Sequence, residues 1–207
     1  MFEVEARGKL PISIDEASAK LKGLGGKFLE RRKRFSLIYM RQPSGPTNDI
    51  KNDPVDLRIR VSNGKSEIVL KYGESGSFDN RIEVSVPIET SDFSSAVELF
   101  KLLGFTQGVV TVTDSYKFEY KDIEFVFVST NESGPAYFEA ERLTENKEDI
   151  EKERRYIMDV CTELGMEPSS QQEYIELLNS INNMPGHRFD LKKESFDSIK
   201  QRFEGYF

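Results

Sequence analysis

The stretch Phe2-Glu3-Val4-Glu5-Ala6-Arg7 alternates charged side chains with apolar or small ones. Because successive side chains of a β-strand point to opposite faces, this pattern predicts a strand with Glu3, Glu5 and Arg7 on one face. The same design returns in three later stretches, at Arg58 and Arg60, at Arg81 and Glu83, and at Glu139 and Glu141. The signs are sorted, with acidic pairs near both ends of this region and basic pairs in its middle. Sorted charge of this kind predicts a binding site rather than a surface that only faces solvent.

The composition indicates a folded, soluble and acidic protein. Of the 207 residues, 37% are hydrophobic and 11% aromatic, and 29 basic residues stand against 36 acidic ones, for a net charge of −7. A general nucleic-acid-binding protein shows the opposite balance, so we expect no nucleic-acid partner and interpret the basic run 27–34 as the solvated start of a strand. No apolar run approaches the ~20 residues of a membrane-spanning helix, and the N-terminus does not resemble a signal peptide. We therefore expect a cytoplasmic protein with no membrane partner.

The counts of cysteine and histidine exclude several kinds of site. A single cysteine, Cys161, cannot form an intrachain disulfide, and with a single histidine, His187, the chain cannot build a Cys/His zinc site. A Ser-His-Asp triad would have to rest on His187, which lies far from any nucleophile signature.

Strand and turn signals predict a chain that is mainly β. Strands are predicted over 2–10, 28–41, 56–62, 66–72, 80–88, 109–114, 115–121, 123–129 and 136–142. The Asn63-Gly64 pair lies between two of these strands and predicts a type I′ hairpin. Residues 42–54 are rich in Pro, Gly, Ser, Asn and Asp, which predicts an exposed and mobile loop.

Capping signals predict the helices. Ser13 with Glu16, and Ser170 with Glu173, form capping-box patterns that begin helices continuing to Leu24 and Leu178. Further helices are predicted over 92–103 and 148–164, with a short helix and an aromatic end over 189–207. The apolar stripe between positions 150 and 164 indicates a helix face that lies in the core.

A repeated unit organises these elements. A charged strand, an amphipathic helix, a Leu-Gly pair and a second strand occur over 3–30 and again over 81–113, so that Leu24-Gly25 corresponds to Leu103-Gly104. We expect one domain over 1–182, built of two pseudo-repeated halves and C-terminal helices. The tail, 183–207, is expected to pack on the same domain.

So many two-faced antiparallel strands with short connections predict an α+β, mainly β fold: a closed eight-stranded antiparallel barrel with helices outside and a helical C-terminal extension. The charged strand faces would then line a tunnel. Arginine forks bind phosphate oxygens bidentately, and paired carboxylates hold Mg²⁺ or Mn²⁺, which bridges to the same oxygens. The sequence therefore predicts a site for a polyphosphate and a divalent metal.

At this point the ordered motifs resemble the CYTH family, the triphosphate tunnel metalloenzymes that include class IV adenylate cyclases and thiamine triphosphatases. Glu3-Val4-Glu5-Ala6-Arg7 is similar to the family's Glu-x-Glu-x-Lys, with Arg in place of Lys. Further similarities to family motifs are found at Leu57-Arg58-Ile59-Arg60, Leu70-Lys71, Arg81-Ile82-Glu83, Tyr137-Phe138-Glu139-Ala140-Glu141 and Tyr174-Ile175-Glu176-Leu177-Leu178. The resemblance covers roughly residues 2–178.

The resemblance implies a role for each matching residue. It implies that the metal, Mg²⁺ or Mn²⁺, is held by Glu3, Glu5, Glu139 and Glu141, with Glu83 as a further acidic candidate. It implies that the triphosphate is bound by Arg7, Arg58, Arg60, Lys71, Arg81 and Lys117. Glu3, Glu5, Arg7 and Lys71 are the implied catalytic residues, and Tyr120 falls at the tyrosine of the strand that carries Lys117.

Departures from the family pattern disfavour a complete cyclase site. Ser115 stands where the family strand has its first Lys, and Phe127-Val128-Ser129 occupies the stretch where many members carry an Asp. The early Asp-x-Tyr of cyclase-like members is Leu37-Ile38-Tyr39 here, and Ser85 replaces a second acidic residue after Glu83.

Three functions remain open from the sequence. The first is metal-dependent hydrolysis of a triphosphate such as tripolyphosphate, ATP or thiamine triphosphate. The second is a cyclase that makes cyclic AMP and pyrophosphate, and the third is a binding module that has lost efficient chemistry. Each motif alone has a simpler explanation, such as a solvent-facing Glu pair or, for Lys71, a surface lysine. The sequence also leaves open monomer or homodimer, and whether the loop 42–54 or the tail 185–207 closes over the site.

Overall fold

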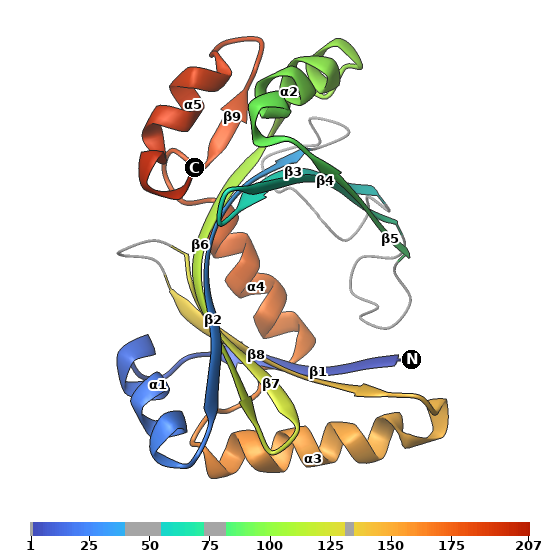
Figure 1. Ribbon diagram of the computed structural model, residues 1–207, viewed down its shortest axis with the longest axis vertical. Coiled ribbons are helices and arrows are strands. Elements are labelled where there is room, and N and C mark those ends of the chain that lie inside the picture. The colour runs from blue at the N-terminus through green and yellow to red at the C-terminus, as the bar shows by residue number, and fades with distance from the viewer. Residues whose placement is uncertain (1, 40–54, 73–81, 131–134) are drawn as a thin grey trace. The chain divides into compact units, whose positions relative to one another are not determined.

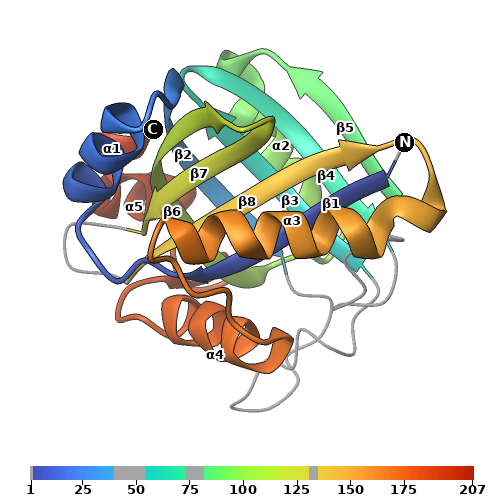
Figure 2. The same ribbon diagram turned by 90° about the horizontal axis from the view of Figure 1, so that it is seen from below.

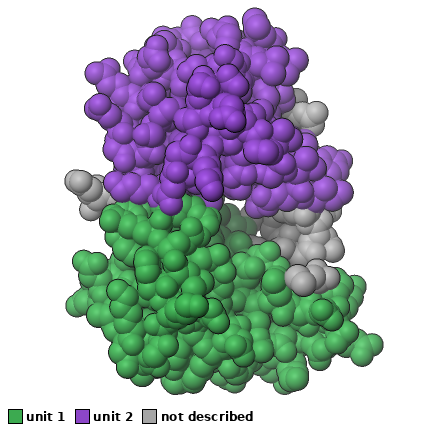
Figure 3. Space-filling model, in the orientation of Figure 1, with its two compact units in different colours: residues 1–32, 113–181 green, residues 33–112, 182–207 purple. Residues whose placement is uncertain are grey.

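The computed structural model describes residues 2–39, 55–72, 82–130 and 135–207. Two compact units make up the chain: unit 1 contains residues 1–32 and 113–181, and unit 2 contains residues 33–112 and 182–207 (Figure 3). The predicted loop 42–54 and the predicted site residue Arg81 lie outside the described residues. Each unit is described below by itself.

The helices and strands follow the predicted order, except that the unpredicted strand β9 precedes the last helix and two predicted strands form the single strand β6. The strands are β1 (Phe2–Lys9), β2 (Lys27–Tyr39), β3 (Val55–Ser62), β4 (Lys65–Tyr72), β5 (Ile82–Ile88), β6 (Gln107–Tyr120), β7 (Ile123–Ser129), β8 (Ala136–Thr144) and β9 (Arg188–Asp190). The helices are α1 (Ile14–Gly23), α2 (Phe93–Leu102), α3 (Ile150–Glu163), α4 (Gln171–Asn182) and α5 (Phe196–Arg202). Short 3₁₀ turns cover Thr90–Asp92, Lys147–Asp149 and Glu204–Tyr206. None of the helices in the described part of the chain has the length and apolar character that crossing a membrane requires.

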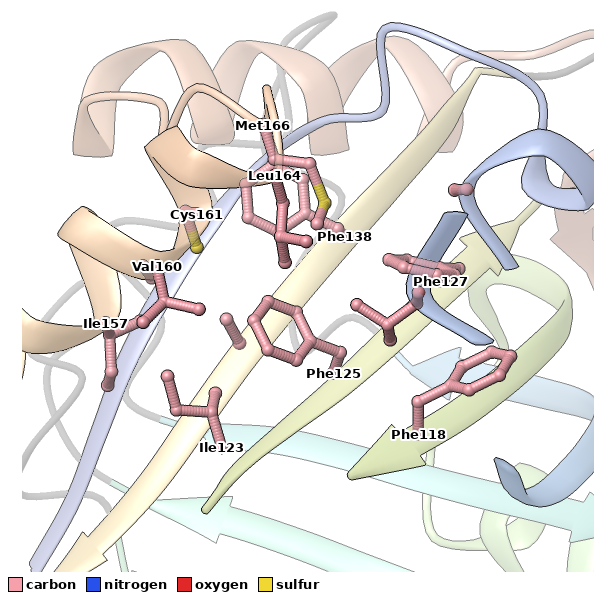
Figure 4. Close-up of a cluster of buried hydrophobic side chains, with 14 of the residues drawn as sticks. Phe118, Ile123, Phe125, Phe127, Phe138, Ile157, Val160, Cys161, Leu164 and Met166 are labelled. Carbon is pink, nitrogen blue, oxygen red and sulfur yellow. The ribbon is translucent and has the colours of Figure 1, made fainter. Parts of the chain in front are cut away.

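Unit 1 is an antiparallel sheet with an apolar face under two helices. Its strand order is β1-β8-β7-β6, with β6 from residue 113 onward, and α3 lies along β1 and β8 (Figures 1 and 2). The strands contribute buried Val4, Phe125 and Phe138 to the core, and α3 with its C-cap residue contributes Ile157 and Leu164. Figure 4 shows Phe125, Phe138, Ile157 and Leu164. Burial of each such side chain stabilises the fold by about 1.5–3 kcal/mol. The predicted apolar stripe of α3 is therefore confirmed as core.

Unit 2 repeats this design around its own core. Its strands run in the antiparallel order β2-β3-β4-β5, and α2 buries Phe93, Val97 and Phe100. The ring of Phe207 packs 5.0 Å from that of Phe93 and 5.6 Å from that of Phe35. The C-terminal segment 182–207 thus belongs to unit 2, and its aromatic end helps to build the core.

Local signals in the sequence are confirmed where the chain turns. Asn63 and Gly64 have positive φ angles of 47° and 76°, as a type I′ hairpin requires. Ser13 and Glu16 form the predicted capping box at the start of α1. The helices α1 and α2 both end at a Leu-Gly pair, in which Gly25 and Gly104 have φ angles of 92° and 93°.

The prediction of separate strands over 109–114 and 115–121 was wrong, because β6 is one continuous strand. Asp114 and Ser115 suggested a break, but their polar groups bond across to β2. Asp114 accepts a hydrogen bond from Nε of Arg31 at 2.9 Å, and the Ser115 hydroxyl donates to the carbonyl of Arg32 at 3.2 Å. Both polar residues therefore fit inside the sheet without a turn.

The sheet is antiparallel and the fold mainly β, as predicted, but closure into a barrel is not seen. Among the strands of the described residues, β1 and β5 stand at the two ends of the hydrogen-bonded order, and β9 pairs with β6. Alternation in the sequence decides which face a side chain takes. It does not decide whether the end strands pair, because that depends on tilt and stagger.

Candidate functional site

The strand register in unit 1 brings the predicted acidic residues together. Glu5 of β1 lies opposite Glu141 of β8, and Arg7 lies opposite Glu139. Glu124 of the next strand, β7, lies opposite Glu141 on the other side. Because the intervening side chains are buried in the core, these charged groups all point to the other face of the sheet.

Arg7 is the cation at the centre of this group. Its guanidinium forms an ion pair with Glu5, and its Nε lies 3.5 Å from Oε1 of Glu139. The Arg7 and Glu5 side chains are only 24% and 9% exposed, so both charges are largely withdrawn from water. Burial disfavours the charged guanidinium, but the nearby Glu139, Tyr174 and Glu5 still raise the pKa of Arg7 above its usual value. Arg7 therefore neutralises only part of the acidic group.

The carboxylates of unit 1 repel one another. Burial, together with the charges of Glu3, Glu124, Glu5 and Glu139, raises the pKa of Glu141 to about 7. Burial also raises the pKa of Glu5 to about 7, although the adjacent Arg7 acts in the opposite direction. The face therefore carries more negative charge than Arg7 compensates.

The donor chemistry suits a hard divalent cation. Mg²⁺ and Mn²⁺ prefer carboxylate oxygens, and Mg²⁺ usually keeps several waters and uses only one or two protein carboxylates. Within the described residues, no group of three or more His, Cys, Asp or Glu side chains is arranged to hold a metal ion. The acidic group thus fits the ion by its ligand type and charge, without forming a complete cage of protein ligands.

Tyr174 of α4 joins this acidic group from a neighbouring helix. Its hydroxyl donates a hydrogen bond to Oε1 of Glu139 at 3.1 Å, and the Arg7 guanidinium lies 5.1 Å from its ring centre. The start of α4 is fixed by the predicted capping box of Ser170 and Glu173. Burial and the charge of Glu139 raise the pKa of Tyr174 far above its usual value, so the phenol is a neutral donor at physiological pH. Tyr174 therefore contacts both the cation and a carboxylate of the site.

Replacing Tyr174 by phenylalanine is expected to lower the free energy of unfolding by about 1 kcal/mol, because the buried hydroxyl loses its bond to a charged group. Urea denaturation would measure the change. Tyr156→Phe is a matched control: the Tyr156 hydroxyl also donates a hydrogen bond, at 3.2 Å to the carbonyl of Lys121, but its side chain is 37% exposed. The control should lose only a few tenths of a kcal/mol. Equal losses for the two variants would contradict a special role for the bond to Glu139.

Unit 2 carries Arg58 and Arg60 of β3 and Lys71 of β4 on one face of its sheet. Nε of Arg60 lies 2.7 Å from Oε1 of Glu67, and Nζ of Lys71 lies 2.8 Å from Oε2 of Glu83. Arg58 forms a two-pronged ion pair with Asp56, at 2.7 Å and 2.5 Å. Ion pairs of partly exposed side chains are weak, so these cations can exchange a carboxylate for phosphate oxygens of higher charge.

Hydrogen bonds to Glu67 hold this network in its charged form. Burial would raise the pKa of Glu67, but hydrogen bonds from Arg60 and Ser85 hold it below its usual value. The Ser85 hydroxyl donates one of these bonds, so the residue that departs from the family pattern has a structural partner in β4. Among the sequence-predicted residues, Arg58, Arg60, Lys71 and Glu83 are thus brought together in unit 2.

Lys117 lies with the acidic group of unit 1. Its Nζ is 2.7 Å from Oε1 of Glu124, whose carboxylate also acts on Glu141. The sequence prediction did not include Glu124, Asp56, Glu67 or a contact by Tyr174. Alternation with buried Ile123 and Phe125 could have placed Glu124 on the charged face. The contact from α4 had no such signal, because it depends on tertiary packing.

A sequence model of the CYTH domain matches residues 1–174 of this chain. Comparison with curated proteins gives no match.

Several solved structures share the fold. The PH1012 protein from Pyrococcus horikoshii OT3 is 25% identical, with a TM-score of 0.64 over 84% of this chain and 98% of that one. A candidate adenylate cyclase from Vibrio parahaemolyticus is 14% identical, with a TM-score of 0.63 over 86% of this chain and 98% of that one. HpAC1 from Hippeastrum, a candidate adenylyl cyclase described as having a dominant triphosphatase activity, is 16% identical. Its TM-score is 0.54, over 89% of this chain and 98% of that one.

Proposed function

Because the chain belongs to the CYTH family, we propose that it is a divalent-metal-dependent enzyme that hydrolyses an inorganic or organic triphosphate. Proteins of this family bind triphosphates and typically use divalent metal ions. The observation that carries the proposal is the acidic group of unit 1, in which Arg7 pairs with Glu5 and Glu139, Glu141 lies opposite Glu5, and the negative charge exceeds what Arg7 compensates. A surface that only faces solvent does not need buried carboxylates of raised pKa.

Each residue of the site has a task in this proposal. Glu3, Glu5, Glu139 and Glu141 are the candidate metal ligands, of which one or two would bind each divalent ion, and the ion would neutralise charge on the phosphate oxygens. Arg7 and Lys117 bind further phosphate oxygens from unit 1. Arg58, Arg60, Lys71 and Arg81 are the predicted phosphate ligands of unit 2. Phosphoryl transfer needs mainly positioning and charge stabilisation, and fixed guanidinium groups supply both while water attacks in line.

The structural role of Ser115 favours hydrolysis over cyclisation. In the family pattern this position carries a Lys, but here its hydroxyl donates to the carbonyl of Arg32, so it serves the sheet. HpAC1, a candidate adenylyl cyclase that shares the fold, is described as a dominant triphosphatase. The eight-stranded barrel closed around the substrate, and the cytoplasmic location, are kept here as predictions from the sequence.

Product analysis tests the proposal. The purified protein is incubated with tripolyphosphate, ATP or thiamine triphosphate and with Mg²⁺ or Mn²⁺, while phosphate, pyrophosphate and cyclic AMP are measured together. We expect metal-dependent release of phosphate. Cyclic AMP with pyrophosphate would identify a cyclase, and tight metal-dependent binding without any turnover would identify a binding module. Either result would overturn the hydrolase.

Replacing Glu3 by glutamine is expected to reduce turnover of any of these substrates at least about 100-fold, because the metal would lose a charged ligand. Glu3 is exposed, so the melting temperature of the metal-free protein should change little. Both quantities are measured on the same preparation. Retained activity in this variant would remove the first strand from the mechanism.

A further inference from the structure

The two repeated units differ in what covers their outer strands. In the sequence repeat, β1-α1-β2 corresponds to β5-α2-β6, with Glu5 matching Glu83 and Leu24-Gly25 matching Leu103-Gly104. The strand β8 beside β1 then corresponds to β4 beside β5. The helix α1 contacts β7, as α2 contacts β3. The correspondence therefore extends from the sequence to the packing of each unit.

In unit 1 the helix α3 covers the outer strands. It lies along β1 and β8, where Val4 is 0% and Ala6 is 8% exposed (Figure 2). It also contacts the flank of α1, because Nζ of Lys20 donates a hydrogen bond to the carbonyl of Leu164 at 2.7 Å. Three positions of the first repeat therefore mark the place of α3: Val4, Ala6 and Lys20.

The corresponding positions in unit 2 are apolar and exposed. Ile82 and Val84, which match Val4 and Ala6, are 64% and 50% exposed. Leu99 of α2, which matches Lys20, is 52% exposed, and the neighbouring Val86 and Tyr72 are 50% and 52% exposed. We call these five side chains the β4–β5 face. Its apolar side chains are exposed at the positions that α3 covers in the other repeat.

The sequence that follows β4 has no counterpart of the apolar stripe of α3. In unit 1, α3 follows β8 after one 3₁₀ turn, and with its C-cap residue Leu164 it supplies a buried stripe that includes Ile157 and Val160. The segment after β4, residues 73–81, contains one large apolar residue, Phe78, among Gly, Ser and charged residues. Such a sequence lacks the spacing of apolar residues that α3 uses.

We propose that the β4–β5 face binds an amphipathic α-helix of a partner protein. The helix would be about as long as α3 and would present an apolar stripe at positions i, i+3, i+4 and i+7, as helix-in-groove recognition requires. The five side chains of the face carry no charge, so the stripe needs aliphatic or aromatic residues and no buried ion pair. The floor of the site is β4 and β5. Because Lys20 of α1 contacts the end of α3 in the other repeat, the matching Leu99 of α2 is expected at its border.

The exposed area favours a helix over a second copy of the chain. The exposed parts of the five side chains amount to on the order of 500 Å², close to the largest apolar patch on a typical monomer, which is often functional. Two copies that met through this face alone would bury about 1,000 Å² in total, less than the roughly 1,200–2,000 Å² of a stable interface. Strand addition along β5 is disfavoured by Pro87, since proline on an edge strand opposes such pairing. A single helix needs no larger surface than this face offers.

Selection from a displayed library tests the proposal. The full-length protein is used as bait for a library of 14-residue peptides with the apolar spacing of α3. Selected peptides are then synthesised with a fluorescent label and titrated against the wild type by anisotropy. We expect helical peptides whose affinity falls at least 10-fold in Val84→Lys and also in Leu99→Lys, because the two positions lie on different elements of one site. Met158→Lys is the control on the solvent side of α3, at a residue that is 44% exposed, and should leave the affinity unchanged.

Circular dichroism and melting temperature establish that the variants are folded, as expected for changes at exposed positions. Sedimentation of the wild type and of Val84→Lys is measured in parallel. Selected peptides that bind both lysine variants as well as the wild type, or a selection that yields no peptide dependent on Val84, would overturn the proposal. A wild-type dimer that Val84→Lys converts to a monomer would also overturn it, because the occupant would then be a second copy.

Discussion

Replacing Glu141 by glutamine is expected to raise the free energy of unfolding of the metal-free protein at pH 8 by about 2 kcal/mol and to abolish metal-dependent turnover. The stability gain follows from the environment of this carboxylate. Burial and four neighbouring carboxylates all raise the pKa of Glu141, from 4.5 to about 7, so the charged form is destabilised in the folded state. A glutamine removes the repelled charge and keeps the shape of the side chain.

The pH dependence of this effect has a definite sign. Between pH 4.5 and about 7 the folded protein binds more protons at Glu141 than the unfolded chain does, so the stability of the wild type falls as the pH rises through that window. The variant lacks this loss. Its advantage should be full at pH 8 and much smaller at pH 5, where the wild-type carboxyl is protonated in the folded state.

Urea denaturation at pH 5 and pH 8, without metal and with Mg²⁺, measures the effect. Mg²⁺ should stabilise the wild type at pH 8 and should stabilise the variant much less. Glu119→Gln is the control, an exposed glutamate on β6, and should change the stability by less than about 0.5 kcal/mol. A Glu141→Gln protein that is less stable than the wild type at pH 8 would show that Glu141 is not repelled.

Replacing Gly108 by alanine is expected to destabilise the protein by more than about 3 kcal/mol, because a neighbouring backbone atom occupies the space that a Cβ atom would need. A Cβ atom at this position would lie 2.1 Å from the carbonyl oxygen of Ile38 and 2.7 Å from Cζ of Phe189. The first of these atoms belongs to β2 and cannot move without disturbing the sheet. The second belongs to β9, which pairs with β6 at this residue.

Gly23→Ala provides the comparison for this prediction. Gly23 is the last residue of α1, and a Cβ there would meet no atom within 4 Å. Alanine should therefore be neutral or stabilise by up to about 1 kcal/mol. Chemical denaturation of both variants measures the difference. A Gly108→Ala protein as stable as the wild type would mean that β2 and β6 separate more easily than their packing indicates.

The ends of the helices and the hairpin turn could be predicted from short-range sequence signals. The capping boxes at Ser13 and Ser170, the Asn63-Gly64 hairpin and the Leu-Gly helix ends each depend on a few neighbouring residues, and all are confirmed. The predicted break between residues 114 and 115 was the exception, because β6 is continuous there. Polar residues at positions 114 and 115 looked like a turn because their partners on β2 are more than 80 residues away in the sequence.

The candidate site was predictable to the extent that it follows strand alternation. Alternation placed Glu5, Arg7, Glu139 and Glu141 on one face, and the register brings these residues into contact. The contribution of Tyr174 could not be predicted this way, because the bond to Glu139 depends on where α4 packs. The roles assigned to these residues by resemblance remain predictions until turnover is measured.

The division of each unit into two sequence segments has a consequence for synthesis on the ribosome. Unit 1 begins with residues 1–32 but needs residues 113–181, so β1 waits for its partner β8 while the whole of 33–112 is translated. During that interval the nascent chain exposes Val4 and Leu21, which are buried in the finished core. Contacts between such distant segments slow folding, since a long loop must close before they form. The nascent chain therefore keeps this apolar surface exposed for longer than a chain whose neighbouring strands follow one another directly.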